Sequence, residues 1–347
     1  MADVAGTNDL RIGVMGAGAV GCYVGGSLAA EGHDVVFVGR ERLKKELEAS
    51  GLVLANLDGA TGRVVAKEKL VFQTKLSALA NRDVVLCCVK SAQTEETARE
   101  LASVLPPGTV VVSLQNGVRN ADVLSAALTD QHVLGGIVGF NVVSKGSGTF
   151  RRATSGPLVI ESSADPRVVE LVRGLSAAGF QVELVKDIRP LQWSKLVMNL
   201  NNAVGALSDR PTKELLFSAG YRRILGAVMA EAVKVLRAAK TPTAKLGVLP
   251  VGLFPLVLRL PSAILRVVAG AQVKIDPEAR SSMWEDLSRN RPTEVDHLNG
   301  EIVRLAESCG ATAPLNARMV EIVHDAEKRG AGSPKLTAEE LWSALHR

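Results

Sequence analysis

One short segment carries a lysine and two amides at spacings that bring them together on a helix. Within Trp193–Asn202, Lys195 is followed by Asn199 and Asn202. At about 100° per residue, Asn199 lies about 40° to one side of Lys195 and Asn202 about 20° to the other. Such groups are costly to bury unless they meet polar partners, and a polar substrate would supply them. A polar stripe on a half-exposed helix has the same spacing, so the segment predicts either a substrate pocket or a solvated face.

A second polar cluster lies nearer the C-terminus. Ser282 and Asp286 are four residues apart, which makes them neighbours on a helix, and Glu294 follows Pro292. A proline at that place kinks the chain or begins a new helix. By themselves these residues are typical of a polar helix end with carboxylates near its N-terminus.

A glycine pattern near the N-terminus predicts a phosphate-binding loop. The apolar run Ile12–Met15 leads directly into Gly-x-Gly-x-x-Gly. Gly16 would allow a tight turn, Gly18 would let backbone N–H groups reach a pyrophosphate, and Gly21 would let the next helix pack closely. The N-terminus of that helix favours negative charge. The predicted cofactor loop is Gly16, Ala17, Gly18, Ala19, Val20 and Gly21. A structural turn without function is the alternative.

Three further polar residues follow predicted strands. Arg40 comes after the second strand, where an acidic residue would favour NAD and an arginine favours the 2′-phosphate of NADP. Arg42 is a second candidate for that phosphate. Lys90 and Asn116 each follow an apolar strand, and ligands of open α/β sheets bind at such strand ends. We therefore expect NADP(H), with Lys90 and Asn116 near its ribose and nicotinamide. A solvated loop arginine, an exposed lysine and an Asn-Gly turn are the plain alternatives.

These residues must be positioned by two kinds of architecture. The first half alternates apolar strands with helices, which predicts a mainly parallel, doubly wound sheet. The expected strands are 11–15, 35–38, 84–89, 110–114 and 133–138, with shorter ones at 158–161 and 181–185. The expected helices between them are 18–31, 42–50, 94–104 and 121–127.

After about Pro190 the apolar spacing becomes helical. The expected helices are 191–207, 218–239, 277–290 and 293–308, and Thr337-x-x-Glu340 predicts a capping box for a short last helix. We expect a flexible tail at 1–10, a Rossmann NADP-binding domain at 11–187 and a helical substrate-binding and catalytic domain at 188–347.

Bulk properties narrow the class of protein. The 347 residues carry a formal charge of +5 without a run of basic residues, which suits an acidic small ligand better than nucleic acid, although a solvated surface explains it equally well. The four cysteines have no metal-ligand spacing, so we expect no metal, reduced thiols and a cytoplasmic protein. The segment 246–271 is apolar, but prolines and two arginines interrupt it, so short buried helices or an apolar flap are expected rather than a membrane span.

Taken together, these motifs resemble the ketopantoate reductase (2-dehydropantoate 2-reductase) family of NADPH-dependent oxidoreductases. The resemblance extends from Gly16 to about Gly330. Its motifs are the glycine loop, Arg40, Val89-Lys90, Asn116-Gly117, Lys195-x-x-x-Asn199, Ser281-Ser282-Met283, Glu294 in Arg-x-Thr-Glu-x-Asp, Asn299-Gly300, and Pro314 with Asn316. The ordered set is far more specific than any single motif.

The resemblance implies an α/β fold with an N-terminal Rossmann doubly wound sheet and an all-helical C-terminal domain, as in 6-phosphogluconate dehydrogenase. It implies NADPH-dependent reduction of ketopantoate to (R)-pantoate, in pantothenate and CoA biosynthesis, with the active site between the domains. The residues that match the family's site are Lys195 and Glu294 as catalytic groups, Asn199 and Ser282 as substrate ligands, and Lys90 and Asn116 as cofactor ligands. The partner is then a small 2-keto acid rather than nucleic acid or a membrane, and a homodimer is left open.

One position departs from the family. A second substrate asparagine, four residues after the first, is replaced here by Ala203, and Asn202 is displaced by one residue. Either Asn202 substitutes for it or the substrate is another 2-keto acid. A related 2-hydroxy acid or polyol-phosphate dehydrogenase and a non-catalytic NADP-binding sensor are the competing functions. Because Lys195 and Glu294 are both present, catalysis is favoured over the sensor.

Overall fold

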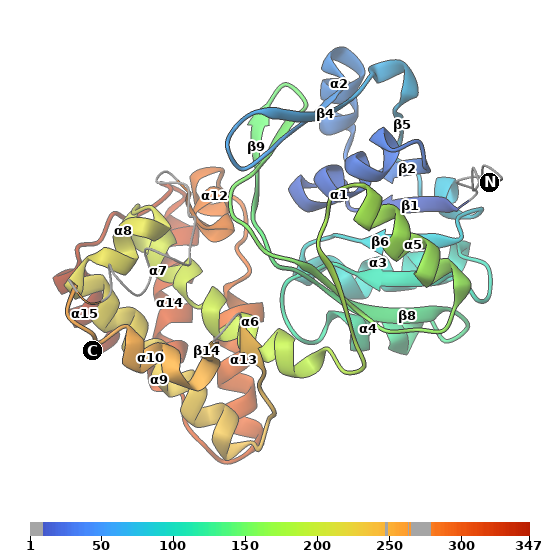
Figure 1. Cartoon of the computed structure of the whole chain (residues 1–347). Helices are drawn as coiled ribbons and strands as arrows, with labels where there is room; N and C mark the ends of the chain where they lie inside the picture. The colour runs from blue at the N-terminus through green and yellow to red at the C-terminus, as the bar shows by residue number, and fades with distance from the viewer. Residues whose placement is uncertain (1–9, 247–248, 263, 265–278) are drawn as a thin grey trace. The chain divides into compact units, whose positions relative to one another are not determined.

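The chain forms two compact units, Met1–Ile188 and Arg189–Arg347. The structure, a computed structural model, describes residues 10–246, 249–262, 264 and 279–347 (Figure 1). The expected tail at 1–10 therefore lies almost wholly outside the described residues.

An eight-stranded sheet in the order β12-β11-β8-β7-β6-β1-β2-β5 organises the first unit. Its strands are β1 (Arg11–Met15), β2 (Asp34–Val38), β5 (Val71–Gln73), β6 (Val84–Cys87), β7 (Val110–Ser113), β8 (His132–Val138), β11 (Leu158–Glu161) and β12 (Val182–Val185). All neighbouring pairs are parallel except β8 with β11. The chain builds outward from β1 to β2 and then returns to β6, so the strand order reverses between β1 and β6. Ligands of doubly wound sheets bind at such a reversal.

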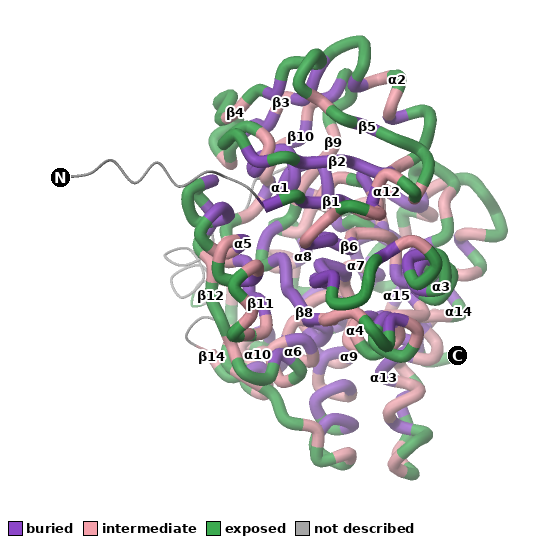
Figure 2. Tube along the Cα trace, turned by 90° about the vertical axis from the view of Figure 1, so that its right-hand side faces the viewer, coloured by how far each residue is buried: buried purple, intermediate pink, exposed green. Residues whose placement is uncertain are grey.

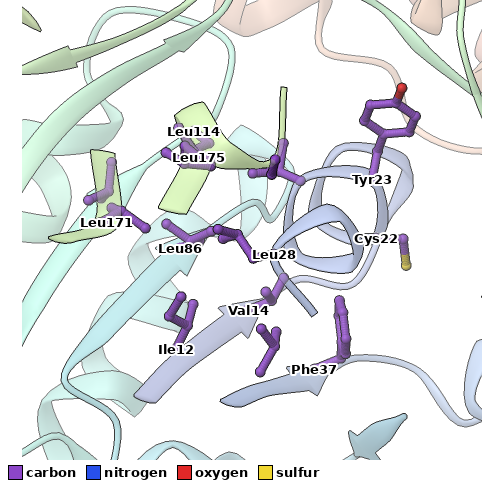
Figure 3. Packing of buried hydrophobic residues seen from close by; sticks show 14 of the residues in the cluster. Ile12, Val14, Cys22, Tyr23, Leu28, Phe37, Leu86, Leu114, Leu171 and Leu175 are labelled. Atoms are coloured by element: carbon purple, nitrogen blue, oxygen red, sulfur yellow. The ribbon is translucent and has the colours of Figure 1, made fainter. Parts of the chain in front are cut away.

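Apolar side chains cover both faces of this sheet, as the parallel strands predict. Figure 3 shows Ile12, Val14 and Leu86 packed toward α1 (Ala19–Ala30) and α5 (Pro166–Ala177). On the other face, Val85 and Val111 belong to a cluster with α3 (Thr94–Val104) and α4 (Asn120–Ala127). Figure 2 shows β1 and β2 buried along most of their length. The predicted doubly wound fold is confirmed.

A second sheet, which the sequence analysis did not predict, packs against α1. Its order is β4-β3-β10-β9, from β3 (Leu52–Ala55), β4 (Thr61–Val65), β9 (Val142–Gly146) and β10 (Thr149–Arg152). Because it lies between two sheets, α1 is buried over Gly21–Leu28 and shows almost no polar face. The remaining elements of this unit are α2 (Glu41–Ser50), η1 (Lys67–Lys69), η2 (Leu76–Leu79) and η3 (Ser91–Gln93).

Helices dominate the second unit and pack around α9 (Ala219–Ala238). The others are α6 (Arg189–Asn199), α7 (Asn201–Ser208), α8 (Thr212–Phe217), α10 (Phe254–Val257), α12 (Ser282–Ser288), α13 (Val295–Ser308), α14 (Pro314–Arg329) and α15 (Ala338–Leu345), with η4 (Val251–Leu253) and the short strands β13 (Lys245–Leu246) and β14 (Leu249–Pro250). The predicted capping box is confirmed, because Thr337 and Glu340 bond reciprocally at the start of α15.

Two predicted helices differ in detail. The helix expected at 191–207 is interrupted at Leu200, whose N–H is shared between the carbonyls of Leu196 (3.2 Å) and Val197 (3.4 Å). The helix expected from residue 293 begins at Val295, because the Thr293 hydroxyl accepts the Val295 N–H.

Part of the apolar segment 246–271, and residues 277–278 of the helix expected at 277–290, lie outside the described residues. The described helix there, α12, is shorter than predicted: it begins at Ser282, where Ser281 caps it, and ends at Ser288. In the part of the chain that the structure describes, no helix is both long and apolar enough to cross a membrane.

Candidate functional site

The glycine loop joins the end of β1 to α1 and has the geometry of a phosphate-binding turn. Gly16 has φ +89°, and a Cβ there would lie 2.6 Å from the Val89 nitrogen. A Cβ on Gly21 would lie 2.5 Å from the Gly16 oxygen. In contrast, a Cβ on Gly18 would meet nothing within 4 Å. Packing thus requires glycine at Gly16 and Gly21, whereas Gly18 leaves open space where a ligand would approach the backbone.

The N-terminus of α1 adds the electrostatic part of this site. Gly18 occupies the N-cap position, and no side chain caps the first N–H groups of the helix. Those donors and the helix dipole favour an anionic group. The loop therefore fits the pyrophosphate of a dinucleotide.

Arg40 and Arg42 differ in how they are held. Arg40 is the N-cap residue of α2, directly beyond β2, and its exposed side chain makes no hydrogen bond or ion pair with any described residue. Arg42 instead donates to Glu46 across one helical turn (3.2 Å). Of the two, Arg40 is the cation free to meet a phosphate.

A buried network of neutral groups joins the loops that carry Lys90 and Asn116. The hydroxyl of Ser91 donates to the backbone oxygen of Asn116 (2.9 Å), and the Asn120 amide reaches the same oxygen. Thr94 donates to the Asn120 side-chain oxygen (2.8 Å). The two strand ends are thereby locked together beside the reversal of strand order.

Gln115 extends the network to the backbone just beyond β6. Its amide donates to the hydroxyl of Thr94 (2.7 Å) and to the Val89 carbonyl (3.1 Å), and its oxygen accepts from Ser113 (3.0 Å). The sequence analysis missed these supporting residues. Their only signal was a run of polar side chains immediately after two buried strands.

Lys195 has a strongly perturbed pKa. It lies on α6 between the buried residues Ser194 and Leu196. Burial lowers the pKa of Lys195 to about 8, and the negative charge of Glu294 opposes that shift. An ammonium with such a pKa is mostly protonated at neutral pH yet gives up a proton readily. Those are the properties of a general acid.

Glu294 is buried just before α13. Three nearby residues, Glu327, His324 and Asp296, hold the start of that helix in place. Glu327 on α14 accepts the backbone N–H of Thr293 (2.7 Å) through one oxygen and contacts His324 Nδ1 (2.7 Å) through the other. His324 Nε2 lies 3.1 Å from Asp296. Burial by itself would lower the pKa of His324. The hydrogen bonds and charges of Glu327 and Asp296 outweigh burial, so the pKa of His324 is raised above its usual value. This cluster was not predicted from the sequence.

The predicted substrate residues occupy different environments. Asn199 is the last residue of α6 and is half-buried, as is Asn202 on α7. Because the helix is interrupted at Leu200, the even rotation that predicted one continuous stripe does not hold beyond that point. Ser282 is exposed at the first position of α12.

Ser281, the neighbour of Ser282, has a structural role. It caps α12 by accepting the Trp284 N–H (3.1 Å) and donates to the Asn202 carbonyl (3.0 Å). The Asn202 backbone is thus tied to α12, and its side chain is available for another contact.

Comparison with known proteins assigns the chain to a family. Residues 12–165 match the profile described as ketopantoate reductase PanE/ApbA, and residues 187–327 match the profile of its C-terminal part. A 2-dehydropantoate 2-reductase of Archaeoglobus fulgidus is 31% identical over 326 residues, covering 91% of this chain and 98% of the relative. The chain belongs to the ketopantoate reductase family.

Solved structures agree with the assignment. A PanE/ApbA family ketopantoate reductase from Ralstonia eutropha JMP134 has a TM-score of 0.77 at 33% identity, covering 92% of this chain and 99% of that one. A D-mandelate dehydrogenase, solved with NADH and anilino(oxo)acetate, has a TM-score of 0.72 at 20% identity, over 92% and 99% of the two chains, and shares the fold. The chain is therefore an oxidoreductase that acts on a CH–OH group and takes a nicotinamide cofactor.

Two asparagines of the ketopantoate reductase pattern are part of the interior. Asn299 donates to Asn316 (3.0 Å), and Asn316 donates through its backbone and side chain to Glu231 on α9 (2.9 Å each). Both asparagines are fully buried. They connect α13 and α14 to the central helix. Ala203, where the family often has an asparagine, is also fully buried.

Proposed function

We propose that this chain reduces the 2-keto group of ketopantoate to (R)-pantoate with NADPH. The observation that carries the proposal is Lys195, an ammonium of lowered pKa that feels the charge of the buried Glu294. In this assignment, residues 11–187 bind the cofactor and residues 188–347 bind the keto acid.

Charge explains how the second unit would act. When bound, the reduced nicotinamide supplies a hydride for C2 of the keto acid. As negative charge develops on the carbonyl oxygen, protonated Lys195 stabilises it and then donates a proton. Glu294 keeps Lys195 protonated or accepts from a substrate hydroxyl. Asn199 and Ser282 orient the acid by hydrogen bonds.

The proposed preference for NADPH over NADH depends on Arg40, the cation beyond β2. No acidic residue ends that strand, and the Arg40 guanidinium has no partner among the residues that the structure describes. Lys90 and Asn116 would contact the ribose and nicotinamide, on loops fixed by the neutral network.

A direct assay tests the whole assignment. The purified chain is incubated with ketopantoate and NADPH or NADH in parallel, and loss of the reduced cofactor's absorbance is followed. We expect turnover with NADPH and weaker turnover with NADH. No turnover with any 2-keto acid would refute catalysis and favour a non-catalytic NADP-binding protein.

A matched pair of arginines tests the cofactor choice. Arg40→Ala should raise the KM for NADPH by about tenfold or more, because a charge-assisted bond to phosphate is lost, and should change the KM for NADH little. Arg42→Ala serves as the control, since Arg42 already pairs with Glu46. Equal effects on both cofactors would contradict the assignment.

Another 2-keto acid is the alternative substrate, and Ala203 favours it. A buried alanine replaces an amide that family members often carry. The contacts between the protein and the keto acid must therefore differ from the family's, or Asn202 must supply the missing one. A panel of aliphatic and aromatic 2-keto acids decides which is preferred. Asn202→Ala should raise the KM for the preferred acid, with Asn201→Ala as the neighbouring control. Unchanged kinetics would remove Asn202 from the site.

A further inference from the structure

A cavity in the first unit lies apart from the residues assigned to the cofactor. It has a volume of about 290 Å³ and lies among α1, β4, the loops after β3 and β10, and the loop between α5 and β12. Its polar lining includes Tyr23, Asn56, Arg63, Arg152 and Ser155. The glycine loop, Arg40, Lys90 and Asn116 do not line it, so the proposed function leaves this cavity without a role.

Arg152 brings a positive charge that no described carboxylate neutralises. Its guanidinium donates to the backbone oxygens of Thr154 (3.0 Å) and Gly156 (2.6 Å) and lies 4.2 Å from the centre of the Phe140 ring. These contacts fix its orientation but leave its charge unbalanced. Because a guanidinium has five N–H donors, others remain for a ligand.

Tyr23 supplies a second donor. The residue is only 6% exposed, and its hydroxyl makes no hydrogen bond with the part of the chain that the structure describes. Figure 3 shows that hydroxyl pointing away from the aliphatic cluster. Burial raises the pKa of Tyr23, and the charges of Arg152 and Arg63 act in the opposite direction, so both arginines lie within electrostatic reach. The hydroxyl oxygen is not sealed inside the protein, so an acceptor atom of a ligand in the cavity can reach it.

The other walls define the rest of the ligand. Arg63 donates to Glu31 (3.0 Å), which leaves it partly balanced. Phe180, stacked on Phe140 with 5.7 Å between ring centres, and Leu57 give the cavity an apolar side. No aspartate or glutamate is among the described residues that line it.

We propose that this cavity is a second binding site, for a small organic anion whose carboxylate or phosphate meets Tyr23 and Arg152 and whose flat apolar part packs on Phe180. A volume near 300 Å³ is at the small end of ligand pockets, which limits the occupant to a compact molecule.

Calorimetric titration of the full chain tests this, with phenyl phosphate and benzoate as probes and benzyl alcohol as the neutral control. Titrations are run with NADPH present, so that the cofactor's phosphate sites are filled. We expect saturable binding of the two anions and none of the alcohol. Equal binding of benzyl alcohol, or no saturable binding of either anion, would overturn the proposal.

Tyr23→Phe is the decisive variant, because it removes only a hydroxyl that bonds to none of the described residues. We expect its melting temperature to be unchanged or higher and its anion affinity to fall about tenfold. Arg152→Gln should weaken binding at least as much, and Arg40→Gln should leave it unchanged. Affinity that survives in Tyr23→Phe and Arg152→Gln but is lost in Arg40→Gln would place the anion at the cofactor site instead. Keto-acid turnover without anion binding would overturn this proposal and leave the proposed function intact. Anion binding without turnover would do the opposite.

Discussion

The two units support their candidate site residues with different kinds of chemical group. In the first, hydroxyls and amides of Ser91, Thr94, Gln115 and Asn120 join the strand ends. In the second, the start of α13 beside Glu294 is held by titratable side chains. Neutral hydrogen bonds do not respond to pH near neutrality, whereas the second set does. Cofactor binding should therefore be insensitive to pH, and the chemical step should depend on it.

The largest effect should come from removing the ammonium. Lys195→Ala should lower kcat by about 10² or more, because proton donation and stabilisation of the oxyanion are both lost. NADPH affinity, measured by fluorescence titration, should be unchanged, since Lys195 belongs to the second unit. Lys213→Ala, an exposed lysine of that unit, is the control. Near-normal kcat would remove Lys195 from catalysis.

A substitution in the neutral network should have the next largest effect, and it should change only the stability and cofactor binding of the first unit. Thr94→Val keeps the shape of the side chain but leaves Gln115 and Asn120 short of a partner in a buried site. The free energy of unfolding should fall by about 1–3 kcal/mol, and the KM for NADPH should rise.

The dependence of kcat/KM on pH should not change in Thr94→Val. Thr109→Val, which loses one bond to the Pro106 carbonyl (2.9 Å) outside the network, controls for the substitution itself. A shifted pH profile in Thr94→Val would contradict the division between the two units.

The same contrast explains what could be predicted from the sequence. Strands such as Val84–Cys87 are buried on both faces, so continuous apolar runs reveal them. In the second sheet, β4 and β9 are largely solvated and lack a continuous apolar run, as the 59% exposed fraction of Val64 shows. Local position also pointed to Lys90 and Asn116, since each lies three residues beyond the end of a buried strand.

Contacts between residues far apart in the chain have no comparable signal in the local sequence. Glu327 holds the backbone of Thr293 from 34 residues away, and nothing in the local pattern indicates that pairing. The interruption at Leu200 also has no signal in the local sequence, because leucine is a good helix former. Sequence alone therefore predicted candidate residues, but not what positions them.

A third prediction concerns the pH dependence of the second unit. Because protonated Lys195 is the proposed acid, kcat/KM for keto-acid reduction should fall as pH rises through about 8. Oxidation of the hydroxy acid needs the neutral amine and should rise over the same range.

Removing the charge of Glu294 should move that transition. Glu294 raises the pKa of Lys195, so Glu294→Gln should shift the fall in kcat/KM to lower pH. Glu307→Gln, an exposed carboxylate on the same helix, should leave it in place. A shift to higher pH in Glu294→Gln would show that Glu294 does not act through its charge on Lys195.

The smallest expected effect is a loss of stability when the cluster of His324, Glu327 and Asp296 is broken. It tests whether this cluster stabilises the second unit. The pKa of His324 is raised in the folded chain, so its pairing with Glu327 and Asp296 stabilises fully below the unfolded value of about 6.5 and is lost as pH rises through the folded value. His324→Gln should therefore cost about 0.2–1 kcal/mol near pH 6, because the pairs are partly exposed, and less near pH 9. Denaturant unfolding at both pH values measures this, with Glu321→Gln on the same helix as the control. A cost that grows with pH would mean that His324 is neutral in the folded chain and that Glu327 alone holds the backbone beside Glu294.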